Sequence, residues 1–358
     1  VRSLRLAVRG FLAFRTLQAW ETRDWQRLGI RHPRWPRLHH LVVFPTYREP
    51  LEVLETSLSY LLCQDFPRHR ISVVVAFEAR DPEAPEKARR LRQRFDWAFR
   101  HFWIAFHPDR PGEVRGKSSN LAYAVPWAKR RLVEEFGVPL ENVVVTVCDA
   151  DSRLHPKYLS ALAYRYLTAP DGQDRLYQPA LLFHANLHRL PGPIRALNGL
   201  YTLLSLAKLR RKYTLVPQST YSLGLATCSA VKYWDVDVIP EDSHLFFKVF
   251  FRRGPRVAVE PIYLPVWLDA AEGRTWWATL RAHYHQARRW AWGVSDIPYV
   301  LWHGCRTTTI PFWLRAIRVG HYVKEHLLWP AHWFILFGGL KLLPVATTAA
   351  PVVASADH

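Results

Sequence analysis

The feature that most constrains the fold is an alternation of short apolar runs with longer charged stretches in the first half of the chain. The runs are rich in Val, Ile and Phe, which is typical of buried strands, and they read HHLVVFPTY, ISVVVAF, HFWIAF and NVVVTVCD. The stretches between them begin near Leu51, Pro82 and Lys117 and have helical spacing. Repeated alternation of strand and helix predicts an α/β domain with a mostly parallel central sheet.

Two aspartates follow the fourth run. Asp149 and Asp151 come directly after the apolar strand, with one alanine between them. Carboxylates this close repel each other unless bulk water or a bound cation lies between them, so the pair indicates either a solvated turn or a metal site. Ligands of parallel sheets bind beyond the carboxyl ends of the strands, which is where this pair falls.

Other polar residues are expected at the same edge of the sheet. They follow the first, second and third runs, and they are Glu49, Glu78, Lys117 and Asn120. Three of them have a structural alternative. Glu49 could cap the helix that begins near Leu51. Lys117 could be solvated, and Asn120 could cap a turn. Their coincidence at one edge indicates a ligand site.

Two motifs in the second half of the chain carry further polar residues. Glu241 and Asp242 precede an apolar helical run, where the alternative is that they only complement the helix dipole. In HYHQARRWAWG, Gln286 and Arg289 are three residues apart and share a helix face, so both can reach one phosphate. The neighbouring Trp290 offers a flat apolar surface that suits a sugar ring.

Composition limits the class of partner. The formal net charge of +19 and the pI near 10.1 favour an anionic partner, which could be nucleic acid, a phosphorylated ligand or an acidic membrane. Aromatic residues crowd the carboxyl-terminal segments and do not lie beside the basic residues, which argues against nucleic acid. The four cysteines are far apart, which argues against a zinc site or a disulfide framework. Met is absent even at position 1, which predicts a piece of a longer protein.

Both ends of the chain have patterns typical of membrane contact. Residues 1–35 place apolar and basic side chains on different faces of one helix. The apolar face contains Leu4, Val8, Phe11 and Leu12, and the basic face contains Arg2, Arg5 and Arg9. A helix that packs on the core is the alternative. Residues 326–354 contain one formal charge, Lys341, and predict a transmembrane segment. Residues 269–325 mix aromatic and basic residues as interface helices do.

The ordered motifs P-T-Y-R-E, E-A-R-D, G-K-S-S-N, D-A-D, P-E-D and Q-A-R-R-W resemble those of the family 2 inverting glycosyltransferases. The resemblance is to the membrane-bound, processive-type branch that contains the cellulose, chitin and hyaluronan synthases, and it spans about Leu38 to Gly293. It implies a nucleotide-sugar-binding domain of the GT-A type over residues 36–268. Amphipathic interface helices and a carboxyl-terminal transmembrane segment would follow.

The resemblance also implies roles for single residues. Asp242 would be the catalytic base, Arg289 would act on the departing diphosphate, and Asp149 and Asp151 would bind a Mg or Mn ion. The substrate-binding residues would be Pro45, Tyr47, Glu49, Glu78, Lys117, Asn120, Asp149, Glu241, Gln286 and Trp290. Inverting transfer needs only one base, because the leaving group departs from the opposite face of the sugar. A divalent cation and a guanidinium would stabilise the charge that develops on the leaving diphosphate.

The expected function is therefore transfer of a sugar from a UDP-linked donor to a hydroxyl of a saccharide acceptor, in polysaccharide synthesis. The enzyme would bind anionic membrane lipids and no nucleic acid, with its catalytic domain facing the cytoplasm. Two alternatives are single-sugar transfer to a lipid or glycolipid, and a noncatalytic membrane scaffold that binds nucleotides.

Three features depart from the family pattern. Glu78 stands where many relatives have an aspartate pair. The segment STYSLGLATCSAVKYW lacks the aromatic-cysteine-glycine signature of the cellulose synthases, and no second long apolar span is present in the sequence.

Overall fold

The computed structural model describes residues 2–328, and side chains from residue 4 onward. Within these residues the chain forms one mixed sheet with strand order β3-β2-β1-β4-β7-β6-β8-β5. The strands are β1 (His39–Thr46), β2 (Ile71–Glu78), β3 (His101–His107), β4 (Val143–Val147), β5 (Arg153–Leu154), β6 (Arg175–Leu182), β7 (Tyr221–Gly224) and β8 (Ala258–Trp267). The four apolar runs are β1 to β4, so the predicted strands are confirmed.

The sheet has a parallel half and a mixed half. Strands β3, β2, β1 and β4 run parallel, whereas β7 is antiparallel to both β4 and β6. Strand β6 is parallel to β8, and β5 is antiparallel to β8. The predicted α/β fold with a mostly parallel sheet is therefore confirmed. The carboxyl ends of β1, β2 and β4 meet at one edge, as the sequence predicts.

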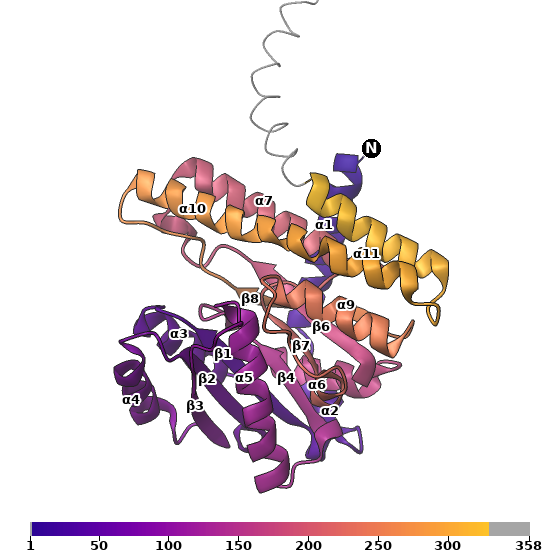
Figure 1. Ribbon diagram of the computed structural model, residues 1–358. Helices are drawn as coiled ribbons and strands as arrows, with labels where there is room; N and C mark the ends of the chain where they lie inside the picture. The colour runs from indigo at the N-terminus through magenta and orange to yellow at the C-terminus, as the bar shows by residue number, and fades with distance from the viewer. Residues whose placement is uncertain (1, 329–358) are drawn as a thin grey trace, which may run out of the picture.

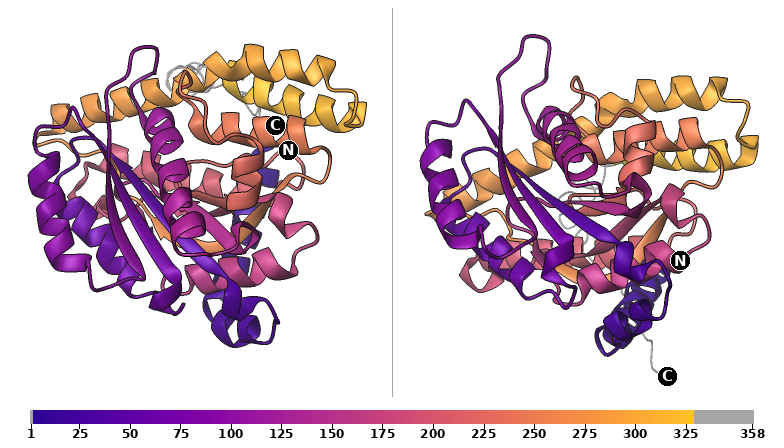
Figure 2. Two further views of the ribbon diagram at one scale, coloured as in Figure 1. Left: turned by 60° about the horizontal axis from the view of Figure 1, so that its bottom comes forward. Right: turned by 90° about the horizontal axis from the view of Figure 1, so that it is seen from below.

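Helices cover both faces of the sheet (Figures 1 and 2). They are α1 (Arg2–Glu21), α2 (Trp25–Ile30), α3 (Leu51–Leu62), α4 (Ala84–Phe95), α5 (Lys117–Lys129), α6 (Tyr158–Thr168), α7 (Gly192–Leu209), α8 (Leu225–Ala230), α9 (Glu241–Arg253), α10 (Trp276–Ala291) and α11 (Ile297–Arg306), and residues 312–328 are also helical. Helices α2, α3, α4 and α6 share one core with the sheet, while α1, α5, α8 and α9 share the other.

The near-continuous apolar strands follow from burial on both faces. In β1, Leu41 and Val43 point into one core, and Val42 and Phe44 point into the other. Because side chains alternate along a strand, a strand that is covered on both faces needs apolar residues at successive positions. This is the reason that the runs read without polar alternation.

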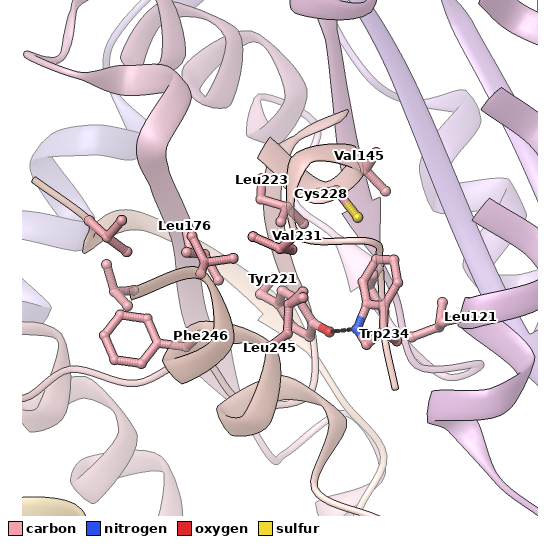
Figure 3. Close-up of a cluster of buried hydrophobic side chains, with 14 of the residues drawn as sticks. Leu121, Val145, Leu176, Tyr221, Leu223, Cys228, Val231, Trp234, Leu245 and Phe246 are labelled. Atoms are coloured by element: carbon pink, nitrogen blue, oxygen red, sulfur yellow. Dashed lines mark hydrogen bonds between the residues drawn. The ribbon is translucent and has the colours of Figure 1, made fainter. Parts of the chain in front are cut away.

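Helix α9 is anchored by the cluster of buried side chains in Figure 3. Leu245 and Phe246 of α9 pack in the same core as Tyr221 of β7. Trp234 is also buried there and donates a hydrogen bond from its indole nitrogen to the Tyr221 hydroxyl at 2.8 Å. Burying a Leu or Phe side chain stabilises a fold by about 1.5–3 kcal/mol. The packing therefore fixes the amino end of α9, where Glu241 begins the helix.

The amino-terminal helix α1 packs against α7 and β8. Its buried face contains Ala13 and Leu17. This face packs on the core, as the alternative to membrane contact predicted. The predicted apolar face is a different one and is exposed, with Leu4, Val8, Phe11 and Leu12 each more than 40% accessible. Helix α1 therefore has two apolar faces, and the core covers one of them.

The predicted transmembrane segment falls almost wholly outside the described residues, which end at residue 328 of the predicted span 326–354. Among residues 2–328, no helix is both long enough and apolar enough to span a bilayer. Helices α7, α10, α11 and the helix 312–328 lie together as a layer at the top of Figure 1. The four cysteines are unpaired in the structure.

Candidate active site

Lys117, the first residue of α5, connects three segments at the edge of the sheet. Its ammonium donates to Asp149 Oδ1 at 2.6 Å and to the Ser219 carbonyl at 2.7 Å, and it lies 2.8 Å from Glu241 Oε1. The alternative of a solvated lysine is therefore wrong. The lysine joins the loop after β4, the loop before β7 and the first turn of α9, which lie far apart in the sequence.

Ser219 is the second connection, and the sequence analysis missed it. Its hydroxyl donates to Asp149, and its backbone N–H donates to Asp242 Oδ2 at 3.1 Å. Its φ of 58° lies in the left-handed region, which is uncommon for a serine. The other Asp242 oxygen accepts the backbone N–H of Ser243 at 2.7 Å. Asp242 is thus held by two backbone donors, and no motif marks Ser219 because two of its three contacts use backbone atoms.

Burial and neighbouring charges divide the four ionisable groups into two kinds. Burial disfavours the charged form of Lys117, but the charges of Asp149 and Glu241 outweigh burial and raise the pKa of Lys117. Burial also opposes ionisation of Asp149, yet Lys117 lowers the pKa of this carboxyl. In contrast, burial raises the pKa of Glu241 and of Asp242, and Lys117 offsets only part of the effect. The site therefore pairs a fixed ion pair with carboxyl groups that hold protons more strongly than usual.

A buried histidine holds α9 to the start of α11. His244 lies with Nδ1 2.5 Å from Asp296 Oδ1 and with Nε2 2.8 Å from Asp235 Oδ2. Burial by itself would lower the pKa of His244, but hydrogen bonds to Asp235 and Asp296 outweigh burial and raise the pKa to about 9. The imidazolium thus bridges two carboxylates, one of which also pairs with Lys248, and fixes the helix that carries Asp242.

The Q-x-x-R-W motif lies at the end of α10. Arg289 is exposed, and its charge contributes to lowering the pKa of Asp149. Trp290 packs against Phe183 and meets Tyr201 of α7 edge-on, with 5.4 Å between the ring centroids. Gln286 is partly buried one turn before Arg289. The motif therefore contributes a cation and an aromatic surface to the site.

A second group of predicted residues lies at the ends of β1 and β2. The Glu49 carboxylate accepts the Thr46 hydroxyl at 2.6 Å and the Tyr47 backbone N–H, so it closes the turn after β1. It does not cap α3, whose N-cap is the next residue. The Glu78 carboxylate pairs with Arg80, whose guanidinium lies 3.7 Å above the Tyr47 ring centroid. A small hollow at this end is lined by Glu78, Arg80, His107, Arg110 and Arg115, among others.

Two further predicted residues are part of the framework. Pro45 is buried within β1 and pairs in register with Ala76 of β2. Asn120 is almost fully buried in the first turn of α5 and donates from its amide to the Ala76 carbonyl at 2.7 Å. This bond fixes α5, and with it Lys117, against the sheet. A direct contact of Pro45 or Asn120 with a substrate stays a prediction.

A family model described as "Glycosyl transferase family group 2" matches residues 144–355. The chain belongs to this family. It is a glycosyltransferase, and it has the α/β glycosyltransferase fold with a mostly parallel, mixed sheet.

A solved structure of another protein shares the fold. The mannosyltransferase PcManGT from Pyrobaculum calidifontis, solved in complex with GDP-Man and Mn2+, is similar at a TM-score of 0.56 and 19% identity, over 97% of this chain and 88% of that chain. TarS residues 1–349 from S. aureus, solved in complex with UDP-GlcNAc, align at a TM-score of 0.48 and 13% identity. The alignment covers 82% of this chain and 72% of that chain. None of the curated proteins matches the chain.

The Asp149–Asp151 loop of this glycosyltransferase has carboxylates that could hold a cation. Asp151 accepts the backbone N–H of Asp269 at 3.0 Å. Burial and the charge of Asp149 raise the pKa of Asp151 to about 7. A carboxylate destabilised in this way gains from a nearby cation. Within residues 2–328 no group of three His, Cys, Asp or Glu side chains could hold a metal. Mg²⁺ in proteins commonly uses one or two carboxylates together with substrate phosphates, so the two aspartates fit that type of site.

Proposed function

We propose that this glycosyltransferase moves a sugar, with inversion, from a UDP-linked donor to a hydroxyl of a saccharide acceptor. The observation that supports this most directly is the hydrogen-bonded group around Lys117. It joins Asp149, next to which a diphosphate would lie, to Glu241 and Asp242 at the start of α9. A single fixed group therefore links the donor end of the site to a carboxylate with a raised pKa.

Asp242 is proposed as the base. A carboxylate with a raised pKa is a stronger base than an ordinary aspartate, and general-base catalysis works best when that pKa is near the working pH. Asp242 takes the proton of the acceptor hydroxyl while the hydroxyl oxygen bonds to the anomeric carbon. The bond from that carbon to the diphosphate breaks on the opposite face, and UDP departs with the electron pair.

Arg289 is proposed to stabilise the departing diphosphate, because its positive charge acts on Asp149, next to which the diphosphate would lie. Asp149 and Asp151 would hold a divalent cation, which would supply further charge neutralisation to the diphosphate. Lys117 keeps Asp149 ionised and oriented, and the Ser219 N–H keeps Asp242 oriented. The hollow beside Glu78 and the Tyr47 ring are proposed to receive the base of the nucleotide.

The test is a panel of UDP-linked and GDP-linked sugars with Mg or Mn and a saccharide acceptor. We expect the enzyme to release UDP from one UDP-sugar, and this release to need both the cation and the acceptor. Release of GDP only would overturn the proposed donor class. No acceptor-dependent release with any donor would overturn the proposed transfer reaction.

We also propose that the enzyme acts at the cytoplasmic surface of an anionic membrane, as a member of the membrane-bound branch. The support is the layer of helices at the top of Figure 1. Large apolar side chains of these helices are exposed. They are Trp276, Trp277, Tyr284, Trp302, Phe312 and Trp313, and the exposed face of α1 adds Leu4, Val8 and Phe11. Aromatic side chains are typical of membrane interfaces, and the net charge of +19 favours acidic lipids.

Vesicle binding provides the measurement for the membrane proposal. We expect the protein to float with phosphatidylglycerol vesicles at low salt and less at high salt, because basic residues contribute about 1 kcal/mol each near an anionic surface and salt screens them. Trp277→Ser should weaken binding severalfold. Trp97→Ser is the matched control, because Trp97 is equally exposed, at 73% against 72%, but follows α4 on the sheet domain. Equal binding of both variants and the wild type would contradict the proposed surface.

A further inference from the structure

One face of α7 runs between the two catalytic motifs, and no sequence motif marks it. Tyr201 and Lys208 are seven residues apart, two helical turns, and therefore share this face. Tyr201 contacts Trp290 of the Q-x-x-R-W motif, with 5.4 Å between ring centroids. At the other end, Lys208 lies close enough to Asp242 and Glu325 for their charges to act on it. The face thus spans from the motif tryptophan to the proposed base.

Lys208 lacks a partner for its charge within residues 4–328. Its ammonium donates no hydrogen bond and forms no ion pair there, whereas its neighbour Arg211 donates to His321 Nε2 at 2.9 Å and lies 3.6 Å from Glu325. Glu325 is therefore engaged by Arg211. Burial lowers the pKa of Lys208, and this effect outweighs the opposite effect of the negative charges of Glu325 and Asp242. A partly buried cation in this position is stabilised by an anion that binds beside it.

The geometry around Lys208 is fixed by the helix 312–328. The Tyr322 hydroxyl lies 3.1 Å from the hydroxyl of Ser243, which is the residue after Asp242, and it donates to the Gly293 carbonyl at 3.1 Å. The preceding residue, His321, accepts from Arg211. One helix therefore holds the start of α9, the residues after α10 and the residues that follow α7 together.

We propose that this face of α7 binds the acceptor, and that the acceptor carries a phosphate ester near the hydroxyl that receives the sugar. Lys208 would bind the phosphate, since lysine binds phosphates as a compact point charge. Tyr201 and Trp290 would contact the carbon atoms of the acceptor. The proposal rests on the proposed function, because Asp242 as base defines the acceptor side. The phosphate itself does not react and remains on the product.

The phosphate ester has two sources, a phospholipid headgroup and a soluble phosphorylated saccharide or polyol. The exposed aromatic layer of α10, α11 and the helix 312–328 lies beside this site, which makes a headgroup accessible (Figure 1). Both sources present the same chemistry to Lys208. The probes are therefore glycerol 3-phosphate in solution and vesicles of phosphatidylglycerol, with vesicles of phosphatidylcholine for comparison.

The experiment measures binding without a donor, so that it does not depend on turnover. We expect Lys208→Ala to weaken binding of glycerol 3-phosphate, of phosphatidylglycerol vesicles, or of both, by about tenfold or more, as expected for the loss of a charge-assisted contact. Lys208→Arg should restore most of the affinity. Lys212→Ala is the matched control, because it removes the same charge from an exposed position four residues further on. The probe that responds to Lys208 identifies the source.

Three results would overturn the proposal. The first is equal affinity of wild type and Lys208→Ala for both probes. The second is a wild type that binds glycerol 3-phosphate no better than glycerol and phosphatidylglycerol vesicles no better than phosphatidylcholine vesicles. The third is a Lys208→Ala variant that only shifts the acid limb of the pH profile, which would mean that the lysine tunes Asp242 and binds nothing. Failure of the donor panel would instead overturn the proposed reaction and leave the phosphate-binding result standing.

Discussion

Replacing Asp242 with Asn is expected to lower the turnover number by about 100-fold or more, the usual contribution of a positioned general base. The variant keeps the size of the side chain, and its amide oxygen still accepts one of the two backbone N–H groups of Ser219 and Ser243. It cannot accept the proton of the acceptor hydroxyl. Affinity for UDP should stay near that of the wild type, so calorimetry of UDP binding and a turnover assay together separate chemistry from binding.

Glu241→Gln is the neighbouring control. Glu241 faces Lys117 at 2.8 Å and lies beside Asp242 in the first turn of α9, so its loss should disturb Lys117 and lower turnover less than Asp242→Asn does. Burial raises the pKa of Asp242, and the base acts only when deprotonated. Activity should therefore fall as the pH falls through a value above the ordinary aspartate pKa. Full transfer activity in Asp242→Asn would mean that the base lies elsewhere, with Glu241 the next candidate.

The parallel half of the sheet could be predicted because its strands are buried on both faces. Runs such as Val42 to Phe44 must then be apolar at every position, which is a strong signal in a sequence. Strand β5 has two residues and β7 has four, too few to show any period. They exist because β8 and β4 lie beside them, and pairing between distant segments leaves no local pattern.

The site was predictable where its chemistry depends on side chains. Lys117, Asp149 and Asp242 belong to motifs, and the structure brings all three together. Ser219 could not be found in this way, because its carbonyl and N–H are groups that nearly every residue has. Lys208 could not be found either, because a lysine near the end of an amphipathic helix is ordinarily solvated. Whether the charge of Asp242 acts on it depends on how α7 packs against the rest of the fold.

The face of α1 shows a limit of a different kind. Leu4, Val8 and Phe11 form the apolar stripe that the sequence makes conspicuous, yet the core contacts Ala13 and Leu17 instead. Periodicity gives the direction of an apolar face but not the identity of what covers it. The exposed stripe therefore stays a predicted membrane contact.

Replacing Asp151 with Asn is expected to abolish the dependence of nucleotide binding on Mg or Mn, with a loss of affinity for UDP of about 100-fold or more in the presence of Mn. Loss of groups that only orient a metal ligand already costs about 10–100-fold, and Asp151 would be a ligand itself. The reason lies in its surroundings. Asp151 is partly buried and accepts one backbone N–H, so a cation would compensate its charge, and a neutral amide would be a weaker ligand for that cation.

Asp149→Asn should weaken the same binding less, because Lys117 and Ser219 already satisfy much of the Asp149 charge. Asp174→Asn is the control for loss of a carboxylate, since Asp174 pairs with Arg253 in another part of the fold. The measurement is calorimetric titration of UDP with and without Mn. If Asp151→Asn and Asp149→Asn both bound UDP with Mn as the wild type does, the pair would be a polar turn and the diphosphate would depend on Arg289 and Lys117 alone for its countercharge.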